Sequence, residues 1–138
     1  MGPLKDIKAI EFSGIGPGPY CGMLLADLGA DVIRVSRKET KGLQNKFDIH
    51  NRSKRTITVD LKNKESVKEL LKLIGQVDVV FEGFRPGVME KLGLGPDECL
   101  KVNPKLVYGR MTGWGQEGPM ANLAGHDINY ISLSGALN

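Results

Sequence analysis

Short β-prone runs alternate with helical segments along this chain, and glycines mark the points where a strand gives way to a helix. The first unit starts with a strand-like run at residues 7–13, passes a glycine and proline cluster at residues 14–19, and continues as a helical pattern that closes at Gly29. A buried-type apolar run at residues 31–36 follows, so a βαβ unit is complete within about 30 residues. This order predicts a doubly wound, Rossmann-like α/β fold, whose mostly parallel sheet carries helices on both faces.

The rest of the chain continues the alternation. The clearest helix spans residues 66–74, where apolar residues recur at helical spacing and Asn63 can cap the first turn. Residues 38–54 are polar and without a period, and we expect a mobile loop there with one turn of helix. Further strands are expected at residues 55–61, 77–82 and 106–111, short helices at residues 88–92 and 96–102, and a last helix from about residue 125.

Length and composition exclude several classes of protein. The 138 residues fit one domain, residues 1–138, and 41% hydrophobic with 25% charged residues is average for a folded domain. The net charge of +3 is too small for a nucleic-acid-binding face, and no apolar run is long enough for a membrane span or a signal peptide. Cys21 and Cys99 lack a paired metal spacing, so we expect reduced thiols, no metal site and an intracellular protein.

In a doubly wound sheet a ligand lies at the carboxyl ends of the strands, so the glycine-rich segments after the strands are the places to examine. The first has Gly16 and Gly18 at the spacing of a dinucleotide fingerprint, but Cys21 stands where the third glycine belongs. The second strand leads into Arg37, with no acid to hold the ribose hydroxyls of NAD. NAD is therefore disfavoured, whereas NADP or coenzyme A, each with an extra ribose phosphate, is compatible. A tight turn beside a solvated Arg37 explains these residues equally well.

A short basic run, Lys46, Arg52, Lys54 and Arg55, follows near this site. Such a run is usually a solvated face, and that interpretation is preferred from the residues alone. The alternative is a clamp for a diphosphate, because cations beside phosphates gain charge-assisted hydrogen bonds.

His126 has a more specific context. It follows Gly125 at a predicted helix start, with Asp127 beside it. A helix N-terminus disfavours an imidazolium and favours the neutral ring that can act as a base. A histidine without a role is still the commoner case, and His50, which lacks such a context, is assigned to a loop.

Five blocks of sequence together resemble one known family. They are residues 15–19 (Ile-Gly-Pro-Gly-Pro), 27–35, 82–87 (Glu-Gly-Phe-Arg-Pro-Gly), 109–116 and 125–130 (Gly-His-Asp-Ile-Asn-Tyr). In this order and spacing the blocks resemble the α-methylacyl-CoA racemases, within the family III CoA-transferase group, from about Leu4 to the last residue. The last block is similar to the racemase branch in particular.

The resemblance implies a substrate and a reaction. The substrate would be a coenzyme A thioester with a 2-methyl-branched acyl chain, whose α-proton is removed by one base and returned by another on the opposite face. His126 would be one acid/base, and the backbone N–H of Asp127 would stabilise the thioester oxygen as it becomes an enolate. No cofactor would be needed, since coenzyme A is part of the substrate.

The resemblance also implies binding residues, which fall into two groups. Nucleotide contacts are expected from Arg37, Lys54, Arg55, Thr58, Val59, Asp60, Leu61 and Arg85. The acyl and pantetheine path is expected along Ile15, Ala124, Gly125, Ile128, Asn129 and Tyr130, together with the glycine-rich turn.

Members of this family are considerably longer, with a second domain and an interlocked homodimer whose active sites use both chains. This chain ends just after the histidine block, so we expect the N-terminal part of such an architecture, with the opposite carboxylate outside it. The implied compartment is the peroxisome or mitochondrion in a eukaryote and the cytoplasm in a bacterium.

Other functions stay open at this point. A family III CoA transferase would take a carboxylate nucleophile from outside this chain, although His126 favours the racemase. A non-catalytic CoA-binding or dimerisation fragment would fit the short length. An NADP-binding domain is disfavoured by the missing third glycine.

Overall fold

The computed structural model describes residues 2–12, 14–37 and 48–137 and contains one five-stranded sheet. Its strand pairs are all parallel, in the spatial order β3-β2-β1-β4-β5. The order changes direction between β1 and β4, which is the switch point where an open α/β sheet leaves a crevice. The strands are β1 (Lys8–Phe12), β2 (Asp31–Ser36), β3 (Arg55–Thr58), β4 (Val79–Glu82) and β5 (Val107–Arg110).

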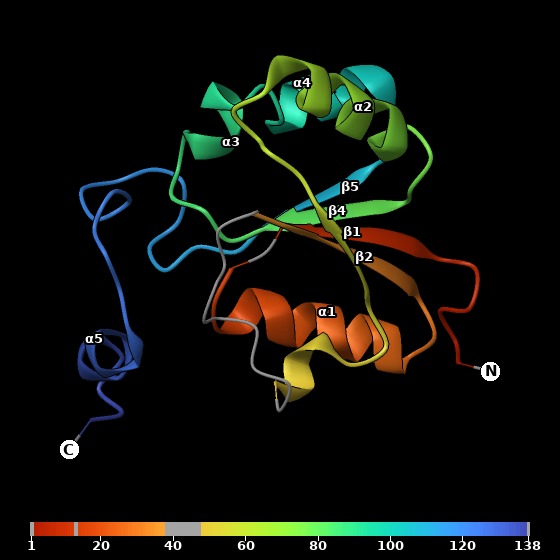
Figure 1. Cartoon of the computed structure of the whole chain (residues 1–138). Helices are drawn as coiled ribbons and strands as arrows, with labels where there is room; N and C mark the ends of the chain where they lie inside the picture. The colour runs from red at the N-terminus through yellow and green to blue at the C-terminus, as the bar shows by residue number, and fades with distance from the viewer. Residues whose placement is uncertain (1, 13, 38–47, 138) are drawn as a thin grey trace.

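Helices cover both faces of the sheet (Figure 1). On one face lie α1 (Pro17–Asp27) and the short 3-10 helix η1 (Ile49–Asn51). On the other lie α2 (Lys64–Ile74), α3 (Val88–Lys91) and α4 (Pro96–Val102). The last helix, α5 (Asp127–Leu133), stands clear of the sheet near the C-terminus (Figure 1). The predicted doubly wound, Rossmann-like architecture is confirmed. Within the described residues no helix has the length and hydropathy to span a membrane.

The apolar core is divided between the two faces. Successive side chains of β1 point to opposite sides, so Ile10 is fully buried on the α2 side and Ala9 on the α1 side. The larger cluster includes Ile74 of α2 and Leu94, and the smaller one includes Ala26 of α1. Burying a large apolar side chain contributes roughly 1.5–3 kcal/mol, which is what holds the helix layers on the sheet.

The amphipathic helix predicted for residues 66–74 is present as α2 and begins two residues earlier. Asn63 caps it, since its Oδ1 accepts the backbone N–H of Glu65 at 2.9 Å and of Ser66 at 3.2 Å. Leu70 and Ile74 of this helix are buried in the core. The sequence pattern therefore predicted both the helix and its cap.

Several element boundaries differ from those predicted. The first helix begins at Pro17 and not near residue 20, because the fixed φ of proline suits the first helical position. Gly16, the cap of this helix, has a φ of 71°, and Gly29 after the helix has a φ of 100°. The strand predicted for residues 55–61 ends at Thr58. The one helical turn expected in residues 38–54 is η1, while residues 38–47 lie outside the described residues.

Candidate functional site

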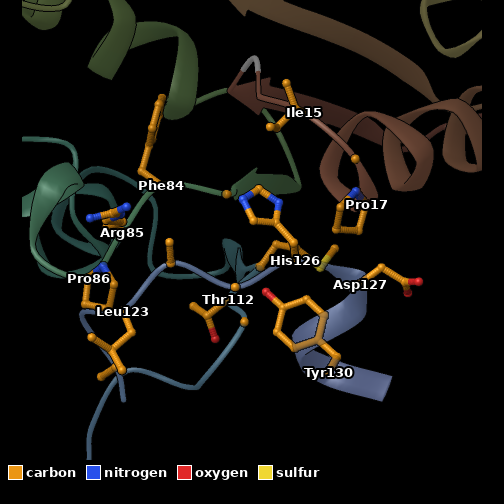
Figure 2. A pocket seen from close by; sticks show the side chains of 17 residues that line it. Ile15, Pro17, Phe84, Arg85, Pro86, Thr112, Leu123, His126, Asp127 and Tyr130 are labelled. Atoms are coloured by element: carbon orange, nitrogen blue, oxygen red, sulfur yellow. The ribbon is translucent and has the colours of Figure 1, made fainter. Parts of the chain in front are cut away.

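A cavity of about 780 Å³ opens at the carboxyl ends of β1, β4 and β5 (Figure 2). Each of these strands is followed by a segment that forms part of the cavity wall, and the loop leading into α5 closes the remaining side. The lining residues are Ile15, Gly16, Pro17, Gly83, Phe84, Arg85, Pro86, Met111, Thr112, Gly113, Ala121, Leu123, Ala124, Gly125, His126, Asp127 and Tyr130. The site lies where a doubly wound sheet is expected to bind its ligand.

The turn between β1 and α1 forms one wall. Ile15 is 77% exposed, and it lines the cavity together with Gly16 and Pro17. Figure 2 shows Pro17 to one side of the His126 ring and Arg85 to the other. The wall therefore presents apolar side chains to a ligand beside the histidine.

The segment after β4 forms a second wall and is held by Glu82. This residue is buried, and its Oε2 accepts the backbone N–H of Phe84 at 2.7 Å. Burial raises the pKa of the Glu82 carboxyl, and the Phe84 hydrogen bond acts in the opposite direction. The bond fixes the chain as it leaves the strand and so places Phe84 and Arg85 on the cavity. The guanidinium of Arg37 lies 5.5 Å from the centre of the Phe84 ring.

The loop after β5 forms the next part of the wall. The backbone N–H of Met111 donates to the Glu82 carbonyl at 2.8 Å, which continues the strand pairing by one residue. Arg110 donates to Gln116 Oε1 at 2.6 Å and also pairs with Glu90. These bonds tie the loop to the strand and to α3, so the positions of Thr112 and Gly113 are fixed.

The His126 imidazole reaches the cavity from the first turn of α5. His126 is the N-cap residue of this helix, and its backbone N–H donates to Asn129 Oδ1 at 2.9 Å. Its ring is exposed and points into the cavity (Figure 2). Asp127 is exposed beside it. The histidine therefore combines a fixed backbone with an imidazole that a ligand can reach.

Tyr130 packs tightly against two glycines. A Cβ atom at Gly113 would lie 2.2 Å from the Tyr130 hydroxyl oxygen, and one at Gly125 would lie 2.4 Å from it. The ring also contacts Trp114, with 4.8 Å between the ring centroids. These glycines leave room for a tyrosine that joins the loop after β5 to α5.

Many of the site residues predicted from the sequence lie together. Ile15, Arg85, Ala124, Gly125, His126, Asp127 and Tyr130 all line the cavity. Arg37 lies beside it through the Phe84 contact. The structure thus brings residues from distant parts of the chain to one place.

Other predicted residues lie elsewhere, and their binding roles stay predictions. Thr58, Val59 and Asp60 line a second cavity of about 500 Å³ between the end of β3 and α2, and Leu61 is buried in the core beside it. Ile128 is 57% exposed on α5 and does not line the first cavity. Asn129 does not line the first cavity either, but its side-chain oxygen accepts the backbone N–H of His126.

The residues of the basic run lie in different environments. Arg55 is exposed, and its Nε donates to Asp31 Oδ1 at 3.0 Å at the amino end of β2. Arg52 is exposed and pairs with Asp27 at 2.5 Å. The Lys54 side chain, in contrast, is fully buried against Glu11. The interpretation as a solvated face is therefore wrong for Lys54, and Lys46 lies outside the described residues.

Sequence reasoning missed some of the lining residues. Ala121 and Leu123 belong to a loop without periodicity, which gave no signal. Phe84 and Thr112 do fall within the sequence blocks at residues 82–87 and 109–116, so the blocks themselves could have pointed to them. Among the described residues, no group of three or more histidine, cysteine and acidic side chains is placed to hold a metal ion.

Comparison with known proteins identifies a family model and several relatives. The model described as CoA-transferase family III matches residues 4–138. The mouse (Mus musculus) alpha-methylacyl-CoA racemase is 47% identical over 135 residues, which cover 98% of this chain and 34% of the mouse protein. The human (Homo sapiens) alpha-methylacyl-CoA racemase is 46% identical over 137 residues, which cover 98% of this chain and 35% of the human protein. The chain thus spans about a third of the length of the curated relatives it matches.

A bacterial relative extends the comparison to a solved structure. The Mycobacterium tuberculosis protein Rv3272, named a probable fatty acyl-CoA transferase, is 40% identical over 146 residues, covering 96% of this chain and 37% of the relative. Its crystal structure superposes with a TM-score of 0.89 at 39% identity, over 99% of this chain and 39% of that protein. These matches confirm the resemblance predicted from the five blocks and agree with the observed fold.

Proposed function

The chain belongs to CoA-transferase family III, and we propose that it takes part in the racemisation of 2-methyl-branched acyl-CoA thioesters. In this proposal it supplies the coenzyme A site and one catalytic base, His126. The observation that carries the proposal is the convergence of Arg85, His126 and Asp127 on one cavity at the carboxyl ends of the strands. A base, a cation and an apolar wall in one place suit a ligand that is charged at one end and reactive at the other.

The cavity has the size and charge for part of a coenzyme A thioester. Its volume of about 780 Å³ lies within the range of small-molecule sites, roughly 300–1,000 Å³, and is sufficient for the pantetheine arm and the thioester. Arg85 on the wall and Arg37 beside Phe84 offer cations to the phosphates. Charge-assisted hydrogen bonds between guanidinium and phosphate would anchor the nucleotide end of the ligand.

His126 would remove the α-proton of the bound thioester. The C–H bond breaks, its electron pair moves into an enolate, and the proton passes to the neutral imidazole. The negative charge then lies on the thioester oxygen. The backbone N–H of Asp127, at the first position of α5, lies outside the hydrogen bonds of the helix and can donate to this oxygen.

Inversion needs a second proton donor on the opposite face of the enolate. Return of the proton from His126 gives exchange with solvent at unchanged configuration, whereas return from the other side inverts the α-carbon. We propose that a carboxylate outside this chain supplies that second proton. Coenzyme A is part of the substrate in this scheme, and no step uses a cofactor.

The test combines binding with isotope exchange. Calorimetry should give saturable binding of coenzyme A to the chain. Incubation with a 2-methylacyl-CoA in deuterated water should incorporate deuterium at the α-carbon, detected by mass spectrometry. A chain that binds coenzyme A but never exchanges the α-proton would contradict catalysis by this chain alone, and a chain that does not bind coenzyme A would contradict the site.

A CoA-transferase activity is the second candidate, and the name of the relative Rv3272 favours it. Transfer needs a carboxylate nucleophile that takes the acyl group from coenzyme A, and in this alternative that carboxylate also comes from outside this chain. Incubation with an acyl-CoA and an isotopically labelled free acid separates the two activities. A transferase forms labelled acyl-CoA, whereas a racemase exchanges the α-proton without any free acid.

A further inference from the structure

We propose that Lys54 and Glu11 form a positioning pair, which holds the first turn of α1 against the sheet and with it the preceding turn, one wall of the cavity. The proposal rests on the coenzyme A site proposed above and adds two residues that do not line the cavity. Lys54 thereby acts on the ligand through the turn and not by contact with a phosphate.

A single ammonium group connects three segments of the chain. The Nζ of Lys54 lies 2.5 Å from Glu11 Oε2 and 2.8 Å from the carbonyl oxygen of Pro19, and both charged side chains are fully buried. Glu11 belongs to β1, Pro19 to the first turn of α1, and Lys54 directly precedes β3. The pair therefore fixes the start of α1 relative to the sheet.

Within the part of the chain that the structure describes, residues 14–17 are exposed, whereas Gly18 and Pro19 at the start of α1 are buried. Apart from chain neighbours and the backbone of α1 itself, no heavy atom of the described residues lies within 4 Å of where a Cβ would stand at Gly14, Gly16 or Gly18. Among the described residues, no side chain other than that of Lys54 donates a hydrogen bond to residues 14–19. Loss of the Lys54 hydrogen bond should therefore loosen the first turn of α1 from the sheet and free residues 14–17 to move.

Burying the charged side chains of Lys54 and Glu11 carries a desolvation cost, so their presence here argues for a geometric role. Burial raises the pKa of Glu11, while Lys54 and Arg34 act in the opposite direction. The second carboxylate oxygen, Oε1, has no hydrogen-bond partner among the described residues. Buried ion pairs are often no more stable than apolar side chains of similar volume, but apolar side chains could not hold the Pro19 carbonyl.

The consequence for the site follows from what the turn presents. Ile15 and Pro17 line the same cavity as His126, so a shift of the turn moves the wall against which the thioester lies. A misplacement of about 1 Å can lower a rate by about a hundredfold. Loss of the hydrogen bond from Lys54 to the Pro19 carbonyl should therefore weaken ligand binding even if the fold survives.

Four variants test the pair. Lys54→Met removes the ammonium group, and Glu11→Gln removes the carboxylate charge but keeps an oxygen that can accept from Lys54. The double variant, Lys54→Met combined with Glu11→Gln, removes both charges together. Lys101→Met is the matched control, because Lys101 pairs with Glu98 at 2.8 Å on the exposed face of α4, outside both cavities. Each is measured for its urea midpoint, its Kd for coenzyme A and hydrogen–deuterium exchange of the backbone amides of residues 14–23.

If the pair has a positioning role, the double variant should recover stability without recovering its affinity for coenzyme A. Glu11→Gln, in which Lys54 still holds the Pro19 carbonyl, should keep its Kd within about twofold. The double variant should regain the urea midpoint lost in Lys54→Met, because no unpaired charge stays buried. Its Kd should nevertheless be raised about tenfold or more, with faster exchange in residues 14–23. Lys101→Met should match the wild type in all three.

The opposite result identifies a purely structural pair. If the double variant regains the midpoint and also shows wild-type affinity and wild-type exchange in residues 14–23, the pair has no positioning role. The exchange measurement needs no ligand. Absence of coenzyme A binding in the wild-type chain would therefore overturn the proposed function, while the exchange data still decide whether Lys54 holds the turn.

Discussion

Arg37 and Phe84 meet at the rim of the cavity, with the guanidinium carbon 5.5 Å from the centre of the aromatic ring. Arg37 follows β2 and Phe84 follows β4, so the contact spans the strand between them. A cation on an aromatic face gains about 0.5–1 kcal/mol at an exposed site, which favours one position of the guanidinium. The contact places a positive charge beside the proposed coenzyme A site.

Replacement of Arg37 by alanine should weaken coenzyme A binding. Loss of a charge-assisted hydrogen bond to phosphate is expected to lower the binding free energy by about 1–3 kcal/mol, measured by calorimetry. Arg55→Ala is the comparison, because Arg55 pairs with Asp31 near the amino end of β2 and should give a smaller loss. Unchanged affinity in Arg37→Ala with an intact fold would remove Arg37 from the site.

Replacement of Asn129 by alanine should lower the exchange rate more than the affinity. Asn129 Oδ1 accepts the backbone N–H of His126, and loss of a capping interaction destabilises a helix start by about 0.5–2 kcal/mol. The imidazole then loses its fixed direction, while the phosphate contacts stay. The ratio of α-proton exchange rate to coenzyme A affinity measures this. An equal fall in both quantities would show that Asn129 acts on binding.

Replacement of Gly22 by alanine should destabilise the fold. A Cβ at Gly22 would lie 2.0 Å from Glu11 Oε2 and 2.9 Å from Lys54 Nζ, so it would push the buried pair apart. We expect the free energy of unfolding to fall by about 1–3 kcal/mol in a urea titration. Gly18→Ala is the control in the same helix, because its Cβ would meet open space and alanine favours the helix. Equal stability of the two variants would contradict the close approach at Gly22.

Replacement of Glu82 by glutamine should change how stability depends on pH. Burial raises the pKa of Glu82 above its ordinary value near 4.5, so ionisation of this carboxyl destabilises the folded state as pH rises through the folded-state pKa. Glutamine keeps an oxygen for the Phe84 N–H but does not ionise. As pH rises above about 4.5, the wild type should therefore lose stability relative to Glu82→Gln in urea titrations, until the pH has passed the folded-state pKa. A constant difference between the two proteins would show that Glu82 has no raised pKa.

Local patterns predicted the elements of the fold but not all of their ends. The spacing that builds α2 and the Asn63 cap are both local, and the structure contains both. Pro17 and Pro19 are ambiguous, because proline suits a turn and the first turn of a helix alike, and the prediction chose the turn. Residues 59–61 have a strand-like sequence, yet β3 ends at Thr58.

The buried charges depended on contacts that no local pattern reveals. Lys54 and Glu11 are 43 positions apart, and each is an ordinary surface residue by type. Both side chains are buried because α1 approaches them closely at Gly22. That approach depends on how the helix packs on the sheet, which no local pattern shows. His126 could be predicted from its place at a helix start within a recognisable block, whereas its proximity to Pro17 could not.

The role of His126 is tested by His126→Asn, because asparagine is also a good N-cap residue and should preserve the start of α5. The measurement is deuterium incorporation at the α-carbon of a 2-methylacyl-CoA in deuterated water, with coenzyme A affinity measured on the same samples. The proposed function predicts an affinity within about twofold of the wild type and a loss of exchange of at least about a hundredfold, the usual contribution of a general base. Exchange at the wild-type rate in His126→Asn would contradict the assignment of His126 as the base.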